Sequence, residues 1–267
     1  MDAGALFVRD GDGYVATECT QGAWDPRHAN GGSTLALLGQ VLDTVPTLVP
    51  MTVSRMTADL VRPLPVGRRL TVEPTVVREG KKIQLVDLHL LVDGELHARA
   101  SALRLRDADL SALDGLPTGA PADGGSPLVP PEEVPSLRES ASPARGFLRG
   151  VDMRYAPSRE GSTTGLWIRL EVPVVAGEPV RPSARLAVSF DYANNMGVDF
   201  GAATASTINP DVSAHVLRQQ TGEWVAITGL TRFTPTLGRG VVRAALHDGD
   251  GVFAEVTIGQ LVQPLPR

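Results

Sequence analysis

Apolar and polar positions along the chain predict a β-rich protein that carries two buried helices. Within residues 34–45, apolar side chains at 35, 37, 38, 41, 42 and 45 have helical spacing, and Pro46 ends the helix. This helix is apolar almost all round, which favours burial over a surface position. Strands are predicted on both sides of it, at residues 5–9, 14–18, 52–61, 69–78, 83–92 and 96–105.

The second part of the chain repeats this order of elements. A helix is predicted at 182–195, opened by Pro182, and strands at 146–155, 165–172, 212–217, 224–233, 239–247 and 252–262. Residues 58–72 align with residues 213–227 through Arg62/Arg218 and Gly67/Gly222, with a one-residue gap. A strand pair, one buried helix and a strand meander, occurring twice, predict an α+β double hot-dog fold. In this fold each repeat has a central helix wrapped by an antiparallel sheet.

A segment rich in proline, glycine and serine separates the two repeats. Residues 108–145 show no sustained period of either helix or strand, and a loop of this length is unusual inside one domain. We therefore predict an N-terminal repeat at 1–107, a linker at 108–145 that crosses the surface, and a C-terminal repeat at 146–267.

Composition narrows the class of protein. The 267 residues are 42% hydrophobic and carry a net charge of −5, which disfavours non-specific binding to nucleic acid. Cys19 is the only cysteine, so neither an intrachain disulfide nor a cysteine-based zinc site is expected. The five histidines lack metal-ligand spacing, and we expect no cofactor. No apolar run approaches the ~20 residues of a membrane span and no secretion signal is recognised, so a cytoplasmic protein is predicted.

Several short segments, in order, resemble the thioesterase-like superfamily related to acyl-CoA thioesterase II. They are His28-Ala29-Asn30-Gly31-Gly32, residues 60–67, Ile208-Asn209-Pro210-Asp211, Leu217-Arg218, Gly222-Glu223-Trp224 and residues 247–251. The resemblance covers nearly the whole chain except the linker. It implies a thioester hydrolase in which an Asp, a Thr or Ser, and a Gln of the second repeat hold the reactive water.

The resemblance assigns these catalytic roles to Asp211, Thr231 and Gln260. Asp211 is the implied general base, and Thr231 and Gln260 orient the water. An ungapped count from Gly251 reaches Ile258 or Gly259 at the family's Gln position, so Gln260 aligns only with a bulge or a shifted turn. Each residue also has a structural interpretation. Asp211 shapes a turn after Pro210, and Thr231 and Gln260 belong to the apolar faces of their strands.

Substrate binding is predicted where the first helix begins. His28, Asn30, Gly31 and Gly32 occupy this place, where backbone N–H groups converge and glycines let a ligand approach the backbone. The alternative is a purely structural role, in which the two glycines let the chain turn tightly into the helix and His28 caps local structure. We interpret the polar cluster Asp191–Asn194–Asn195 as a solvated helix end rather than as pocket lining.

The predicted function is hydrolysis of a medium- or long-chain fatty acyl-CoA to the free acid and CoA, in fatty acid metabolism, by a homodimer or higher homo-oligomer. An acyl-thioester binding protein that has lost catalysis is the main alternative. A hot-dog enoyl-CoA hydratase is disfavoured, because neither residues 25–32 nor 191–197 match the D-x-N-P-x-H segment of that class. No G-x-S-x-G nucleophile elbow occurs.

Overall fold

The structure, a computed structural model, describes residues 4–23, 25–110, 112–113, 115, 126–140, 146–159, 164–194, 196 and 205–264. Its first part contains the predicted hairpin, one long helix and a four-stranded meander. The elements are β1 (Phe7–Asp10), β2 (Gly13–Ala16), α1 (Gly31–Leu42), β3 (Met51–Leu60), β4 (Arg69–Arg78), β5 (Ile83–Val92) and β6 (Glu95–Arg106). The predicted bounds of β4 and β5 are confirmed, and buried positions alternate along β5.

The second part has the same elements in the same order, with one addition. They are β7 (Val151–Pro157), β8 (Thr164–Leu170), α3 (Pro182–Ala187), β10 (Asp211–Val216), β11 (Val225–Thr234), β12 (Arg239–Asp248) and β13 (Gly251–Pro264). The added strand is β9 (Ala205–Ile208), which the sequence pattern does not predict. The predicted helix at 182–195 is interrupted: α3 ends at Ala187, and the 3-10 turn η4 (Phe190–Ala193) follows. The predicted strand at 146–155 begins instead with the 3-10 turn η3 (Gly146–Arg149).

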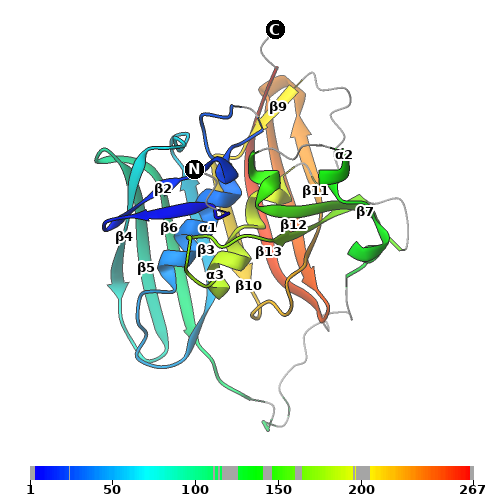
Figure 1. The fold of residues 1–267 in the computed structure, drawn as a ribbon. Helices are drawn as coiled ribbons and strands as arrows, with labels where there is room; N and C mark the ends of the chain where they lie inside the picture. Colours follow the sequence, from blue (N-terminus) through cyan, green and yellow to red (C-terminus); the bar gives the residue numbers. More distant parts are fainter. Residues whose placement is uncertain are drawn as a thin grey trace.

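One continuous sheet joins the two halves (Figure 1). Its strand order is β1-β2-β4-β5-β6-β3-β10-β13-β12-β11-β8-β7, and β9 pairs with β13. The order in the second half therefore repeats the order in the first. The halves meet at the antiparallel pair β3–β10, where Ala58 lies opposite Val212. The predicted double hot-dog α+β fold is confirmed.

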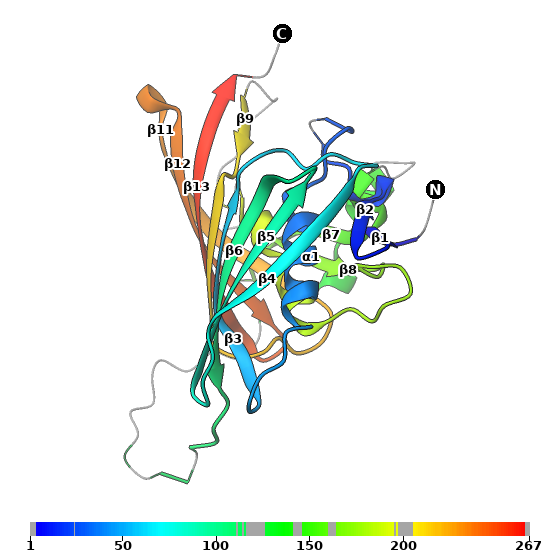
Figure 2. The ribbon, with the colours of Figure 1, turned by 90° about the vertical axis from the view of Figure 1, so that its left-hand side faces the viewer.

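Helices α1 and α3 pack against each other (Figure 1), and α1 lies on the inner side of the curved sheet (Figure 2). Every residue of α1 from Gly32 to Leu42 is buried, as its all-round apolar pattern predicts. The core includes Leu35, Leu37 and Leu38 of this helix. Within the described residues, no helix has the length and apolar character needed to cross a membrane.

Gly39 lets the two helices approach closely. A Cβ at this position would lie 2.4 Å from the backbone oxygen of Ser183. A side chain could relieve such a clash by changing rotamer, but a backbone atom cannot. The α1–α3 contact therefore requires glycine at this point, and it fixes the relative position of the two helices.

We expect Gly39→Ala to destabilise the protein by about 1–3 kcal/mol, because the added methyl group forces α1 and α3 apart. Without that contact, the same change inside a helix stabilises by roughly 0.5–1 kcal/mol. The free energy of unfolding in urea measures the difference. Gly249→Ala is the control, since a Cβ there meets nothing within 4 Å and should change stability by less than about 0.5 kcal/mol. A more stable Gly39→Ala variant would contradict the packing argument.

Hydrogen bonds confirm that the two halves are structural repeats. The N–H of Arg62 donates to the His97 carbonyl, and the N–H of Arg218 donates to the Phe253 carbonyl. Gly67 and Gly222 have φ of 77° and 69°, so both occupy the left-handed region that glycine favours. β6 and β13 each carry an extra residue at the same place. In β6 it lies between the pairs Leu90–Ala98 and Leu91–Leu96. In β13 it lies between the pairs Leu246–Ala254 and His247–Val252. β13 therefore contains a bulge of the kind that the predicted Gln260 alignment requires.

Part of the predicted linker packs onto the second half. Leu128 is fully buried in a small cluster with Trp167 and Ala226. The Trp167 indole N–H donates to the Val129 carbonyl at 2.8 Å. Alternation along β8 places this cluster on the opposite sheet face from Ile168, which belongs to the main core. Residues 126–134 thus cover the outer sheet face, rather than only crossing the surface.

Candidate active site

The N-terminus of α1 is built around a side-chain cap. Asn30 has extended backbone (ψ 146°), and its Oδ1 accepts a hydrogen bond from the Gly32 N–H at 2.8 Å. This cap begins the helix at Gly31, three residues before the predicted start. The prediction follows apolar side chains, and glycine adds none to that pattern. His28 lies just before it, with its Nδ1 3.3 Å from Asp25 Oδ2. The four residues predicted to bind substrate are therefore gathered at this helix end.

The turn η4 lies against this end of α1. A Cβ on Gly31 would lie 2.7 Å from Asp191 Oδ1, and a Cβ on Gly32 would lie 2.8 Å from the Val188 carbonyl oxygen. Because Gly31 and Gly32 have no side chains, the Asp191 carboxylate and the backbone at Val188 can lie directly against this end of α1. A helix N-terminus attracts negative charge, so the position of Asp191 suits its charge.

Burial raises the pKa of the Asp191 carboxyl above its ordinary value, although hydrogen bonds from Asn209 and the Gly32 amide favour the charged form. Asn209 Nδ2 donates to Asp191 Oδ1 at 2.8 Å. Asn209 Oδ1 is buried and has no hydrogen-bond partner among the described residues. A carboxylate with a raised pKa beside a helix N-terminus is a candidate general base.

Amide and hydroxyl groups continue the site from Asp191 toward the sheet. Asn194 ends η4, three residues after Asp191, and its Nδ2 donates to Thr207 Oγ1 at 3.1 Å. Gln260 Nε2 donates to Asn194 Oδ1. Thr207 and Asn209 are two residues apart, so they lie on the same side of the β9 segment. Thr207 bonds to Asn194, the C-cap residue of η4, and Asn209 bonds to Asp191 within η4. The result is a cluster of Asp191, Asn194, Thr207, Asn209 and Gln260.

The three residues predicted to be catalytic lie in different surroundings. Gln260 is buried on the inner face of β13, with Ile258 and Val256, and belongs to the cluster. Thr231 is also buried, and its hydroxyl donates to the Met196 carbonyl at 2.9 Å. Asp211 Oδ1 accepts from the Gly259 N–H at 3.0 Å.

Asp211 is separated from the other two by the sheet. Val212 and Ala214 of β10 point into the main core, so alternation directs Asp211 to the opposite face. There it lies beside Asp59 of β3, its register partner. The structure thus brings Gln260 and Thr231 to the helix side and does not bring Asp211 to them. The catalytic role of this trio stays a prediction.

Asp191, Asn194, Thr207 and Asn209 were not selected as site residues from the sequence. The cluster at 191–195 was interpreted as a solvated helix end, but Asp191 and Asn194 each bond to the β9 segment. Asn195 lies outside the described residues. The sequence feature that could have identified this cluster is a carboxylate at the end of a buried helix, because such a group requires hydrogen-bond partners.

Both parts of the chain match models of the same family. Residues 20–105 match the acyl-CoA thioesterase N-terminal domain, and residues 131–257 match the acyl-CoA thioesterase C-terminal domain. A comparison with curated proteins gave no match.

Solved structures share the fold over nearly their full length. A thioesterase II of Thermobifida fusca, so described only provisionally, has 18% identity and a TM-score of 0.71, with 98% of this chain and 97% of that chain covered. A similarly described thioesterase of Novosphingobium aromaticivorans has 20% identity and a TM-score of 0.67, with 96% and 98% covered. A hot-dog protein of unknown function from Alicyclobacillus acidocaldarius has 18% identity and a TM-score of 0.65, with 99% and 98% covered. With two family models matched in the order of its two repeats, the chain belongs to the acyl-CoA thioesterase family.

Proposed function

We propose that the protein hydrolyses a medium- or long-chain fatty acyl-CoA to the free acid and CoA, with Asp191 as the general base. The observation that carries this proposal is the Asp191 carboxylate, which is half-buried beside the first turn of α1 and has a raised pKa. Membership of the acyl-CoA thioesterase family supports the substrate class.

The proposed reaction uses the two kinds of group that meet at this helix end. The thioester carbonyl oxygen accepts hydrogen bonds from the first-turn amides of α1, which stabilise the developing oxyanion. Asp191 takes a proton from water as the water oxygen attacks the carbonyl carbon. The carbon–sulfur bond then breaks, CoA leaves as the thiol after receiving that proton, and the acid remains. Asn194, Thr207 and Gln260 orient the water through their polar side chains.

Asp211 is the competing candidate for the base, from the resemblance noted above. We prefer Asp191 because burial raises its pKa and because it lies beside a helix N-terminus, whereas Asp211 accepts a backbone hydrogen bond on the outer sheet face. Gln260 keeps its predicted orienting role in this proposal, and the role of Thr231 stays a prediction. A cytoplasmic location and a homo-oligomeric state likewise remain predictions.

Thiol release from C4 to C18 acyl-CoAs tests the function itself. We expect turnover that rises toward medium or long chains, measured by a thiol reagent under saturating substrate. Saturable acyl-CoA binding without thiol release would instead support the binding protein that has lost catalysis. Conversion of an enoyl-CoA without thiol release would support the hydratase.

The raised pKa of Asp191 predicts the acid limb of the pH profile. A general base must be deprotonated, so kcat/KM should fall as the pH drops through the pKa of Asp191. Because burial raises that pKa, the fall should be centred above pH ~4, where an ordinary aspartate titrates. A profile of kcat/KM from pH 4 to 9 checks this, with a substrate whose own groups do not titrate there. A rate that stays flat down to pH 4 would argue against Asp191 as the base.

A further inference from the structure

Asn209 contacts Asp191 through two hydrogen bonds. Its Nδ2 donates to Asp191 Oδ1 at 2.8 Å and to the Asp191 backbone oxygen at 3.3 Å. Both partners are acceptors, so only the NH₂ group of the amide can face them. Asp191 therefore fixes the orientation of the Asn209 side chain, through one contact to its carboxylate and one to its backbone.

This orientation leaves Asn209 Oδ1 without a partner. The atom is buried and accepts no hydrogen bond among the described residues. A buried acceptor without a partner is unfavourable, and an apolar side chain of similar size would suit this place better if only stability mattered. The amide is thus better explained by what its NH₂ group does for Asp191 than by a contribution to stability.

The hydrogen bond to the Asp191 carboxylate opposes the effect of burial. Burial raises the pKa of Asp191, whereas the hydrogen bonds from Asn209 and from the Gly32 amide lower it. Donors to a carboxylate favour its charged form, which is the form that a general base needs. Without Asn209, the carboxyl group would keep its burial, lose its side-chain donor and stay protonated over a wider range of pH.

Within the described residues, the pKa of Asp191 has three causes, which are its burial, Asn209 and the Gly32 amide. Tyr192 is the titratable neighbour on η4, and burial and the charge of Asp191 raise the pKa of its phenol, so Tyr192 is neutral below pH ~10. The strands that pack on η4 present apolar inner residues, which are Val212, Ala214, Ile227, Val242 and Ala244. The charged residues before α1 and on α3 have other partners: His28 pairs with Asp25, and Arg185 pairs with Glu223. Asn209 is therefore the side chain that controls the ionisation of Asp191.

The internal repeat identifies the counterpart of Asn209. Thr52 of β3 and Ile208 of β9 pair with equivalent residues of β6 and β13. These residues are Leu105 and Leu261, each ten residues after the first residue of its strand. The residue that follows the paired position is Val53 in the first repeat and Asn209 in the second. The first repeat therefore has an apolar side chain where the second has the amide.

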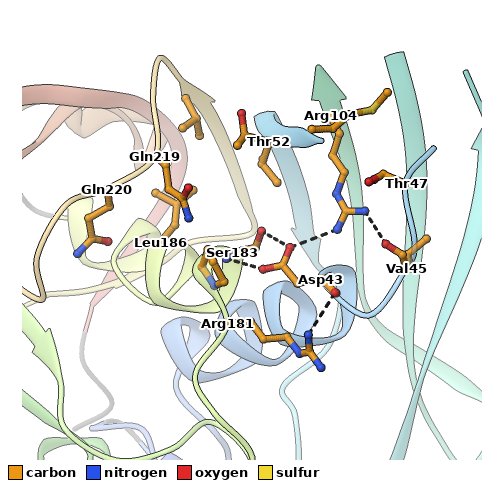
Figure 3. A pocket seen from close by; sticks show the side chains of 14 residues that line it. Asp43, Val45, Thr47, Thr52, Arg104, Arg181, Ser183, Leu186, Gln219 and Gln220 are labelled. Carbon is orange, nitrogen blue, oxygen red and sulfur yellow. Dashed lines mark hydrogen bonds and ion pairs between the residues drawn. The ribbon is translucent and has the colours of Figure 1, made fainter. Parts of the chain in front are cut away.

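The first repeat also lacks a counterpart of the carboxylate. Gln40 holds the position of Asp191, because each lies ten residues after the N-cap of its helix. Its side chain bonds to two backbone groups, an N–H at 3.0 Å and a carbonyl oxygen at 2.9 Å. Figure 3 shows this end of α1, where Arg104 and Ser183 hold the Asp43 carboxylate. The donor is thus absent where the acid is absent, which associates it with Asp191 rather than with the fold.

We propose that Asn209 is a positioning residue, whose NH₂ group holds the Asp191 carboxylate beside the first turn of α1 in its charged form. Asn209 does not act on the substrate and affects catalysis only through Asp191. The inference rests on the proposed function, in which Asp191 is the general base. The effect of Asn209 on the ionisation of Asp191 can nevertheless be measured without turnover.

The pH profile of kcat/KM for acyl-CoA hydrolysis tests the proposal in two variants. Asn209→Leu removes the donor, so the acid limb should move to higher pH by about 1–2 units, the usual effect of one hydrogen bond to a charged group. Asn209→Asp places a second carboxyl group beside Asp191 and should move the limb at least as far. An amide with a purely structural role would instead lower the rate at every pH and leave the limb in place.

The pH dependence of Tm gives a second readout, which needs no substrate. The folded pKa of Asp191 should be higher in Asn209→Leu than in the wild type, so the folded variant binds more protons between these two values. Its loss of Tm should therefore grow as the pH rises through this window. This growth should vanish when Asp191 is also replaced by asparagine, because no carboxyl group then titrates.

Gln40→Leu is the matched control, since it removes a buried amide from the equivalent helix position of the other repeat. It should lower Tm at every pH from 5 to 8 and leave the acid limb in place. An unmoved limb in both Asn209 variants, with losses of Tm that do not depend on pH, would overturn the proposal. A wild type without turnover, but with an Asp191-dependent growth of the Tm loss, would refute only the proposed function. Asp191-dependent turnover with neither effect of Asn209 would refute only this inference.

Discussion

Replacement of Asp191 by asparagine should lower kcat for acyl-CoA hydrolysis by roughly 10²–10⁴-fold, the usual contribution of a general base. The amide keeps the size and hydrogen-bonding capacity of the side chain beside Gly31, but it cannot accept a proton at neutral pH. Acyl-CoA affinity should change little, because the first-turn amides of α1 remain. Single-turnover kinetics with equilibrium binding separates the two effects.

Stability gives an independent readout for the same variant. Because burial raises the pKa of Asp191, its carboxyl favours the folded state at low pH, and this contribution is lost as the pH rises through the folded pKa. At neutral pH the buried charge therefore opposes folding, and a neutral amide should leave Tm unchanged or raise it. A slower but equally stable enzyme would fit a functional carboxylate rather than a structural one.

Asp211→Asn is the matched control, since it makes the same chemical change on the outer sheet face. We expect a change in kcat of less than about threefold, because Asp211 is separated by the sheet from Thr231 and Gln260. A large loss in Asp211→Asn together with an active Asp191→Asn would reverse the assignment. It would support the trio of Asp211, Thr231 and Gln260 that the sequence resemblance implies.

Several strands could be predicted from the sequence because one face of each is buried. β5 has the bounds that its alternating pattern gives, and Ala98, Ala100, Ala102 and Arg104 share the buried face of β6. Such period-2 patterns are local and need no knowledge of partners. β9 was missed because its four residues are too few to show a period, and its pairing with β13 is non-local.

The candidate site could be predicted only in part, because its contacts join distant segments. Asn30 and the glycines at the start of α1 have a local signal, and Gln260 is an amide on an apolar strand face. The partners of Asp191 are Gly31 in the other repeat and Asn209 beyond the end of β9. A single sequence contains no record of such pairings, so the pattern predicted an exposed helix end where a half-buried carboxylate lies.

Loss of Arg218 should be the most destabilising change outside the core. Asp248 is 1% exposed, and its two oxygens accept from Arg218 at 2.6 and 2.7 Å. Burial alone would raise the pKa of Asp248, but hydrogen bonds from Arg218 and from the amides of Thr221 and Asp250 lower it. Arg218→Met removes the cation and leaves a buried charge, for which we expect a cost of about 3–5 kcal/mol. Urea unfolding at pH 7 measures it.

Arg62→Met is the control that the repeat provides. Arg62 makes the corresponding backbone contacts, but its side chain is 48% exposed and its partner Glu95 is 68% exposed. Solvent screens this pair, so its loss should cost no more than about 1 kcal/mol. A lowered pKa stabilises the fold above the unfolded pKa, and that contribution is lost as the pH falls through the folded pKa. The difference in unfolding free energy between Arg218→Met and the wild type should therefore become smaller in acid. Equal losses of stability in Arg62→Met and Arg218→Met would show that burial of Asp248 does not cause the larger cost expected at Arg218.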